Sequence, residues 1–414
     1  MVSESHPSWL PSTQVPEWLR TLSQSGGRFS EILRESEHDA VDGYRHTIRE
    51  ICQQPATWPE TARRLNGFRS QISESMSGCE RILLTGSGSS QYAGECIASA
   101  LRKELQMPVE VQGGGALLLG GSASVGGEPT LVVSLARSGD SPESAAVVER
   151  LLETEPRTRH LILTCNSRGR LAREFTTNAR VTVVSLSEEV HDRSLVMTSS
   201  FTNLALSARF LGWLDQPEEF VALAGRLASA ACRLLTIWPD RLGSFVSGNI
   251  NRMLFIGDGC RFGAARESAL KLLEMTGGKV ATMAETYLGL RHGPMCFIDD
   301  RTLVICFLSS DPLMRAYECD LISELDAKGL GARKLLIGPD NYAAQLCSGG
   351  DLSISYEFPG ADADLALLDA MIGQILGFHR CREEGLQPDS PSATGVISRV
   401  VREFRIHEAQ GTVK

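Results

Sequence analysis

The sequence predicts an α/β protein made of two tandem domains of the same kind. Three observations lead to this prediction. A strand–loop–helix unit occurs twice, short apolar runs alternate with helical patterns in both halves, and glycine- and serine-rich loops follow two of the runs. Such alternation is typical of a parallel sheet with right-handed crossover connections, and ligands bind at the carboxyl edge of such sheets.

The duplicated unit is the strongest of these observations. Its first copy reads RILLTGSGSSQYAGECIASAL over residues 81–101, and its second reads RMLFIGDGCRFGAARESALKL over residues 252–272. At the offset of 252 − 81 = 171, the arginine, a leucine, both glycines, an alanine and the final leucine coincide. An offset of domain size indicates duplicated domains rather than a solenoid of short repeats.

The first 75 residues predict a helical extension, and residues 76–216 the first domain. Three prolines predict an irregular start: Pro7, Pro11 and Pro16. Helical spacing then runs from Ser36 to Gln54 and is expected to end before Pro55. The expected strands of the first domain are ILLTG, TLVVSLA, HLILTC and RVTVVSL, with a helix over residues 141–155 between two of them.

A helical connector is predicted over residues 217–244, and the second domain over residues 245–385. Its expected strands are MLFIG, TLVICFL, KLLIG and LSISYEF, followed by a closing helix over residues 360–385. Residues 386–414 form a tail rich in proline and serine at its start.

Composition excludes several classes of protein. The net charge of −9 and the absence of a basic run argue against nucleic-acid binding. No signal peptide is recognisable, and no segment is expected to be long and apolar enough to span a membrane. Eleven cysteines without a CxxC pair indicate reduced thiols in a cytoplasmic protein. No metal-ligand cluster is evident, so no metal or cofactor is expected.

Two Gly/Ser loops at strand ends form a candidate phosphate site. The loop GSGSS at 86–90 lacks the third glycine of a dinucleotide fingerprint and the GK[ST] of a P-loop. A glycine turn before a helix N-terminus nevertheless suits a phosphate, the alternative being a tight turn with a serine N-cap. The loop RSGDSPES at 137–144 follows another strand at the same edge. The candidate binding residues are Gly88, Ser89, Ser90, Arg137, Ser138, Gly139 and Ser141.

The second domain carries the candidate acid/base residues. Glu267, Lys271 and Glu274 stand at i, i+4 and i+7 and therefore share one helix face. The alternative is a solvated salt-bridge stripe, but the helix is otherwise apolar and begins at the second glycine loop. His292 follows Glu274 by 18 residues, in RHGP, where a rigid exposed turn is expected.

These motifs resemble a known family. GSGSS and ARSGDSPES are similar to the sugar isomerase (SIS) domain, which binds phosphosugars, and ESALKLLEMTGG followed by RHGPM resembles the isomerase half of glucosamine-6-phosphate synthase. EICQQPATW, HDRSLVMTSSFTN and GLQPDSPSATGVISRVV resemble the bacterial tagatose-6-phosphate ketose/aldose isomerases, also described as galactosamine-6-phosphate deaminases. The resemblance implies two SIS domains, each a three-layer αβα sandwich of flavodoxin-like type.

The resemblance also implies residue roles. Glu274 matches the glutamate that moves a proton between C1 and C2, supported by Lys271 and Glu267, and His292 matches a ring-opening histidine supplied by the neighbouring subunit. Ser90, Ser138 and Ser141 match the hydroxyl ligands of the phosphosugar. Ala136 and Arg137 replace a serine and a glutamine, so Arg137 would add a phosphate contact. Whether Arg399 or Arg402 replaces the C-terminal lysine of the synthase stays open.

The predicted function is an amino-sugar-phosphate deaminase/isomerase that converts galactosamine-6-phosphate to tagatose-6-phosphate and ammonia. Two alternatives remain: an aldose–ketose isomerase without deamination, and a phosphosugar-sensing module, which the absence of a helix-turn-helix disfavours. No quoted motif distinguishes galacto from gluco substrates. The expected partners are a phosphorylated hexose or hexosamine and a second copy of the chain, in a homodimer or higher oligomer with shared sites and without nucleic acid or membrane.

Overall fold

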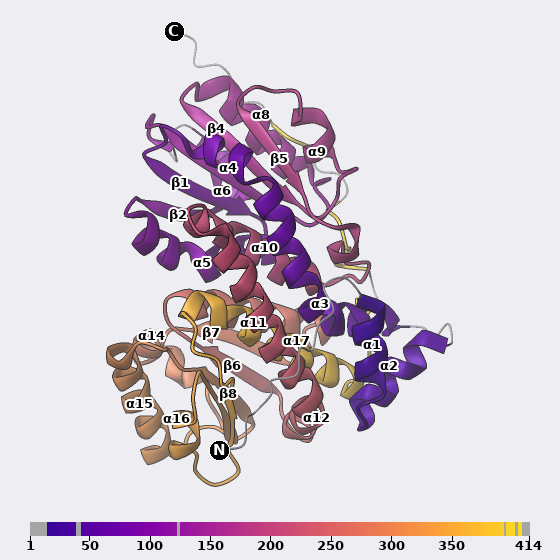
Figure 1. Cartoon of the computed structure of the whole chain (residues 1–414). Coiled ribbons are helices and arrows are strands. Elements are labelled where there is room, and N and C mark those ends of the chain that lie inside the picture. Colours follow the sequence, from indigo (N-terminus) through magenta and orange to yellow (C-terminus); the bar gives the residue numbers. More distant parts are fainter. Residues whose placement is uncertain (1–14, 39–42, 122–124, 393–394, 402–404, 408–414) are drawn as a thin grey trace, which may run out of the picture.

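The computed structural model describes residues 15–38, 43–121, 125–392, 395–401 and 405–407. Two five-stranded parallel sheets lie at opposite ends of the molecule, with the long helices between them (Figure 1). The first sheet lies within residues 76–216 and the second within residues 245–385. The predicted α/β class and the duplication are therefore confirmed.

The first sheet has the strand order β2-β1-β3-β4-β5. Its strands are β1 (Arg81–Gly86), β2 (Val109–Gly113), β3 (Thr130–Ala136), β4 (Thr158–Thr164) and β5 (Val181–Ser185). Strand β2 escaped prediction because VEVQG lies at the sheet edge, where only Val109 is fully buried, so the sequence has no continuous apolar run there.

The second sheet repeats this topology in the order β10-β9-β8-β6-β7. Its strands are β6 (Arg252–Ile256), β7 (Ala281–Glu285), β8 (Thr302–Phe307), β9 (Arg333–Gly338) and β10 (Leu352–Ser355). In each half, the second strand along the chain lies outside the first, and the later strands follow on the other side. Strand β7 is the counterpart of β2 and escaped prediction for the same reason, since ATMAE is only partly buried.

Helices cover both faces of each sheet. The first sheet is covered on one face by α4 (Arg69–Met76), α5 (Ser89–Leu105) and α10 (Ser199–Arg209), and on the other by α6 (Gly114–Gly120), α8 (Pro142–Thr154) and α9 (Arg170–Phe175). The second sheet is covered by α13 (Cys260–Met275) and α17 (Asp362–Glu383) on one face, and by α14 (Tyr287–Leu290), α15 (Pro312–Ala327) and α16 (Tyr342–Gln345) on the other. One hydrophobic cluster runs from sheet to sheet through α5, α13 and α17. The two halves therefore share a core.

The N-terminal extension differs from its prediction. Its helices are α1 (Val15–Ser23), α2 (Arg28–His38) and α3 (Arg45–Gly67). Pro16 lies in the first turn of α1, whereas Pro7 and Pro11 lie outside the described residues. The expected helix end at Pro55 is wrong, because α3 continues through Pro55 and Pro59. Buried side chains on both sides of these prolines, Ile51 and Trp58 among them, hold the helix against α10 and α11.

The connector consists of α11 (Pro217–Ile237) and α12 (Pro239–Val246). By length and composition alone, α11 is apolar enough to cross a membrane, contrary to the expectation from the sequence. In the structure it packs against α3, and its apolar side chains, such as Phe220 and Leu227, are buried in the core. Its hydropathy is that of a core helix.

Helices α5 and α13, the counterparts in the two halves, pack directly against each other. A Cβ added at Gly263 of α13 would lie 2.5 Å from the backbone nitrogen of Cys96 in α5, so glycine is required for this close approach. On the other side of α13, Gly373 of α17 lies against Ser268. These contacts fix the position of α13 relative to the first domain.

Candidate active site

The loop between β1 and α5 depends on its glycines. Gly88 has a φ of 58°, a conformation that favours glycine, and a Cβ at Gly86 would lie 2.6 Å from the Ser90 Cβ. The turn buries Ser89 and Ser90 at the first residues of α5. The Ser87 hydroxyl donates to Glu143 in α8 at 2.7 Å, which ties the first loop to the helix that follows the second.

The second loop lies beside the first because β1 and β3 are paired in parallel, with Thr85 opposite Ser134. Gly139 has a φ of 65°. The Ser138 hydroxyl accepts from the Asp140 backbone at 3.2 Å, and Ser141 is the N-cap of α8. The structure thus places both predicted serine loops at one sheet edge, each followed by a helix N-terminus.

The carboxylate face of α13 points into the protein rather than into solvent. Glu267 is fully buried, Lys271 is 1% exposed and the Glu274 side chain is 23% exposed. The Lys271 Nζ lies 3.5 Å from Glu267 and donates to the Glu274 carboxylate. The alternative of a solvated salt-bridge stripe is therefore wrong.

The charges on this face are set by burial and by one another. Burial raises the pKa of Glu267 to about 8, opposed by Lys271 and increased by Glu274. Neither Glu267 oxygen has a partner in hydrogen-bond geometry within the described chain, although the nearby Ser89 hydroxyl lowers this pKa. Burial lowers the pKa of Lys271, but the two glutamates outweigh it and the net shift is upward. The face therefore combines a buried carboxyl with a raised pKa, a lysine whose charge the two glutamates favour, and an accessible glutamate, Glu274.

Arg137 connects the second loop to two other segments. It is 9% exposed, and its Nη1 donates to the carbonyl of Leu195 at 2.9 Å. Its Nη2 donates to the carbonyl of Arg399 in the tail. Burial lowers its pKa, and among the charges acting on it Asp192 and Glu274 oppose this shift. The guanidinium therefore lies near the acid/base face.

The His292 side chain makes no contact with these residues in the described part of its own chain. The residue is exposed in the turn after α14, and only its backbone nitrogen bonds, to Gly289 at 2.9 Å. Its imidazole has no hydrogen bond or ion pair to the part of the chain that is described. The predicted site residues thus converge except for His292.

Two buried carboxyls beside the site were not predicted. Asp192 accepts from the backbone nitrogens of Thr198 and Ser200 at 2.8 and 2.9 Å at the start of α10. Glu50 of α3 accepts from Arg193 and Ser194, and burial, together with Asp192, raises its pKa to about 8. The only signal for them in the sequence lay in stretches noted for their resemblance, EICQQPATW and HDRSLVMTSSFTN.

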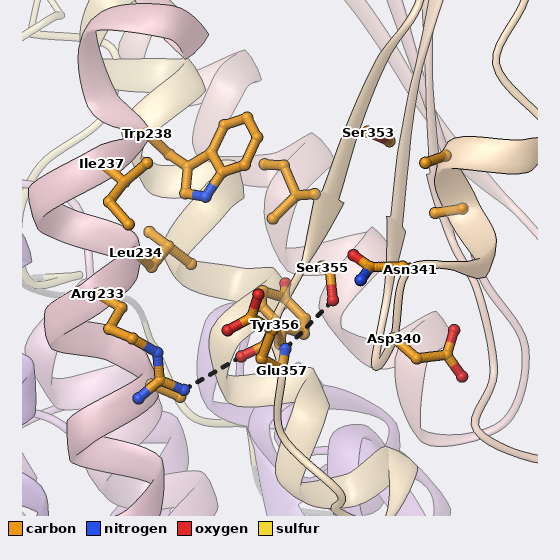
Figure 2. Close-up of a pocket in the computed structure, with 14 residues that line it drawn as sticks. Arg233, Leu234, Ile237, Trp238, Asp340, Asn341, Ser353, Ser355, Tyr356 and Glu357 are labelled. Atoms are coloured by element: carbon orange, nitrogen blue, oxygen red, sulfur yellow. Dashed lines mark hydrogen bonds between the residues drawn. The ribbon is translucent and has the colours of Figure 1, made fainter. Parts of the chain in front are cut away.

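Cavities also lie away from the predicted residues, among them these two. One, of about 950 Å³, is bordered by α1, α2, the start of α3, His191 and Arg399. The other, of about 290 Å³, lies between α11 and the ends of β9 and β10; Figure 2 shows Arg233, Trp238 and Tyr356 around it. Arg233 donates to the Tyr356 carbonyl at 3.3 Å there.

Comparison with known proteins identifies the family. The family model for the SIS domain matches residues 75–209, which contain the first sheet and both serine loops. AgaS of Streptomyces coelicolor is 35% identical over 378 residues, covering 88% of this chain and 96% of that protein. The chain belongs to the AgaS family. The D-galactosamine-6-phosphate deaminase AgaS of Escherichia coli is 32% identical, with the same coverage of both chains.

A solved structure supports the fold over most of the chain. The protein from Clostridium novyi NT, named as a tagatose-6-phosphate ketose/aldose isomerase, is 30% identical with a TM-score of 0.84. The match covers 93% of this chain and all of that one. The second half, which the SIS model does not match, therefore shares the architecture of that solved structure.

Proposed function

We propose that this AgaS-family protein is an amino-sugar-phosphate deaminase that converts galactosamine-6-phosphate to tagatose-6-phosphate and ammonia. The observation that carries the proposal is a buried Glu–Lys–Glu face set against two serine loops at the edge of a parallel sheet. The loops suit a phosphate, and the face suits proton transfer. The names of the relatives supply the substrate class.

In this proposal the phosphate is held by Ser90, Ser138 and Ser141 and by the loop backbone around Gly88, Ser89, Arg137 and Gly139. The two α-helix N-termini favour a dianion there. Sugar carbons then extend toward α13, which lies against the start of α5.

The open-chain aldehyde acidifies the proton on C2. The Glu274 carboxylate removes this proton and returns it to C1, which converts the aldehyde into a ketimine at C2 by way of an enolamine. Water hydrolyses the ketimine to a ketose phosphate and ammonia. Lys271 holds the Glu274 carboxylate in place, while Glu267 fixes Lys271 from the buried side.

Ring opening is assigned to His292 of a second subunit. The exposed imidazole, without a partner among the described residues of its own chain, supports this part of the proposal. It implies a homodimer or a higher oligomer in which each site takes residues from two chains. We further infer a cytoplasmic location, as the cysteines are all free and mostly buried in the described chain.

A second candidate function is favoured by one observation: the similar Clostridium novyi structure is named as a ketose/aldose isomerase. An isomerase without deamination would use the same residues on tagatose-6-phosphate. Ammonia and ketose assays on galactosamine-6-phosphate, glucosamine-6-phosphate and tagatose-6-phosphate separate the two. Ammonia release from galactosamine-6-phosphate is expected, with Glu274→Gln as the inactive control. Turnover of tagatose-6-phosphate alone would favour the isomerase, and no turnover of any would contradict both.

A further inference from the structure

The guanidinium of Arg137 and the backbone of Arg399 connect three segments that are far apart in the sequence. Arg137 follows β3 directly and begins the second serine loop. Besides the Leu195 carbonyl, its Nη1 lies 3.5 Å from the carbonyl of Ser194, and its Nη2 donates to the Arg399 carbonyl. One side chain therefore joins the phosphate loop, the strap at residues 191–195 and the tail segment at residues 395–401.

The second arginine closes the same ring of contacts. Arg399 donates through Nε to the Asp192 carbonyl at 2.8 Å, and its Nη2 donates to the same oxygen. Each arginine thus binds backbone carbonyls, and neither has an ion pair with a carboxylate among the described residues. A hydrogen bond from a charged donor to a carbonyl is stronger than one between neutral groups. These contacts therefore connect the loop, the strap and the tail firmly.

The strap is fixed independently of the two arginines. Glu50 accepts from the Arg193 nitrogen and the Ser194 hydroxyl, each at 2.5 Å, and Asp192 accepts from the start of α10. The Leu195 nitrogen also donates to Asp389 at 3.0 Å. The strap is therefore a rigid support to which the other two segments are attached.

The tail segment, by contrast, has few other anchors. Val396 is 84% exposed and Val401 is 57% exposed, although both are apolar. Among the described residues, the remaining hydrogen bonds of residues 395–401 are made within the tail itself, to Ser392 and between Ser398 and Val400. In Figure 1 the tail, in yellow, runs along the first domain away from the second. Its attachment depends on Arg399.

We propose that Arg137 and Arg399 are positioning residues that clasp the tail and the strap onto the phosphate loop and thereby shape the substrate end of the site. The inference rests on the proposed function. It differs from a simple phosphate contact by Arg137, because it predicts that removing the Arg399 side chain has the same effect as removing the Arg137 side chain. Arg137 also lies close enough to Glu274 and Lys271 for their charges to act on one another. The clasp therefore adjoins the acid/base face.

A double-mutant cycle on the full-length protein tests the clasp. The variants are Arg137→Gln, Arg399→Met and the double variant, with Arg405→Met as the matched control. Arg405 is an exposed arginine of the same tail that has no side-chain bond to the described residues. The readouts are amide hydrogen exchange of residues 395–401 and the KM and kcat for galactosamine-6-phosphate.

Both single variants are expected to speed exchange in the tail by about fivefold or more and to raise KM several-fold. Arg137→Gln removes the bond to the Arg399 carbonyl and Arg399→Met removes the bonds to the Asp192 carbonyl. If both bonds are needed to hold the tail, the double variant is expected to be no worse than either single variant. Arg405→Met should match the unmodified protein. If the changes in exchange rate and KM of the two single variants multiply in the double variant, the two arginines act independently and the proposal is overturned. A raised KM in Arg137→Gln with unchanged tail exchange would also overturn it and would leave Arg137 a phosphate ligand only.

Two features keep the test decisive. Arg137 is buried, so its variant could destabilise the fold, whereas Arg399 is partly exposed and its variant alone tests the tail attachment. Hydrogen exchange needs no substrate. If the unmodified protein turns over no phosphosugar, the proposed function fails while the exchange comparison still decides on the clasp.

Discussion

At the residue scale, the acid/base face shows how one helix can hold three ionisable groups in different states. Glu267 and Lys271 are buried, and Glu274 is the member that solvent or substrate can reach. Glu267 is a buried acid with a raised pKa and lies behind Lys271. The Lys271 ammonium donates to the outer carboxylate, that of Glu274. This difference in exposure supports the proposal that Glu274, rather than Glu267, is the base.

Glu274→Gln tests this assignment. The amide keeps the size of the side chain and removes the base, so kcat should fall by at least ~100-fold while KM stays nearly unchanged. Solvent deuterium exchange at C2 of the substrate should be lost as well. Exchange that persists in the variant would exclude Glu274 and make Glu267 the next candidate.

The serine loops carry a prediction about binding. Ser138→Ala and Ser90→Ala each remove a hydrogen bond to a charged phosphate, a contribution of about 1.5–3 kcal/mol, so KM should rise roughly tenfold or more. Ser77→Ala is the control, since Ser77 is exposed and lies outside both loops. If steady-state kinetics give an unchanged KM in both variants, the phosphate binds elsewhere.

At the element scale, the position of α13 depends on two glycine contacts with its neighbouring helices. The tight crossing with α5 at Gly263 brings the Glu–Lys–Glu face to the serine loops, and the crossing with α17 at Gly373 sets its depth. Close-packed crossings of this kind tolerate no added methyl group without a shift of the helix.

Gly373→Ala should therefore damage both stability and catalysis. The added Cβ would lie 2.9 Å from the Ser268 Cα and closer still to its side chain, next to Glu267. We expect a loss of about 1–3 kcal/mol of unfolding free energy and a lower kcat. Gly225→Ala in α11 is the control, because a Cβ there meets nothing within 4 Å and the change should be neutral or stabilising. If thermal melts show that Gly373→Ala and Gly225→Ala change the stability equally, the packing argument is contradicted.

At the scale of the whole molecule, buried carboxyl groups give stability a particular pH dependence. Burial raises the pKa of Glu318 to about 8, and its Oε2 accepts from the Ser309 nitrogen at 2.8 Å. A carboxyl whose pKa is raised by folding binds more protons in the native state than in the unfolded chain. Its contribution is fully present below the unfolded pKa of about 4.3 and is lost as the pH rises toward 8.

Glu318→Gln should remove that dependence. At pH 5 the variant and the unmodified protein should melt at similar temperatures, and by pH 8.5 the variant should have gained relative stability, because the unmodified protein then buries a charge. Glu128→Gln, at an exposed glutamate, should show no such gain in relative stability between pH 5 and 8.5. A constant difference between the melting temperatures from pH 5 to 8.5 would contradict the raised pKa.

Assembly is the other property of the whole molecule. Mixing inactive Glu274→Gln subunits with inactive His292→Ala subunits should restore about a quarter of the sites when exchange is random, if His292 acts in its partner's site. Proven subunit exchange without recovered activity would place both groups in one chain. A monomer in solution would contradict the shared site altogether.

Much of the site followed from the sequence because its signals are local. Glycine and serine at a strand end, and charges at i, i+4 and i+7, specify a loop and a helix face without knowledge of distant contacts. The edge strands β2 and β7 and the passage of α3 through Pro55 did not follow. Their stability comes from packing against segments far away in the chain, for which a short window of sequence holds no signal.

The sequence by itself determined the duplicated α/β architecture, the two serine loops and the order of the acid/base residues, since each is written in short-range patterns. Only the tertiary structure decided that Glu267 and Lys271 are buried while Glu274 is accessible, that Asp192 and Glu50 support the strap, and that Arg137 reaches Arg399. These properties depend on residues far apart in the chain, such as Glu50 and Ser194 at a separation of 144 and Arg137 and Arg399 at a separation of 262. Burial and charge are properties of the folded surroundings, so no local pattern encodes them.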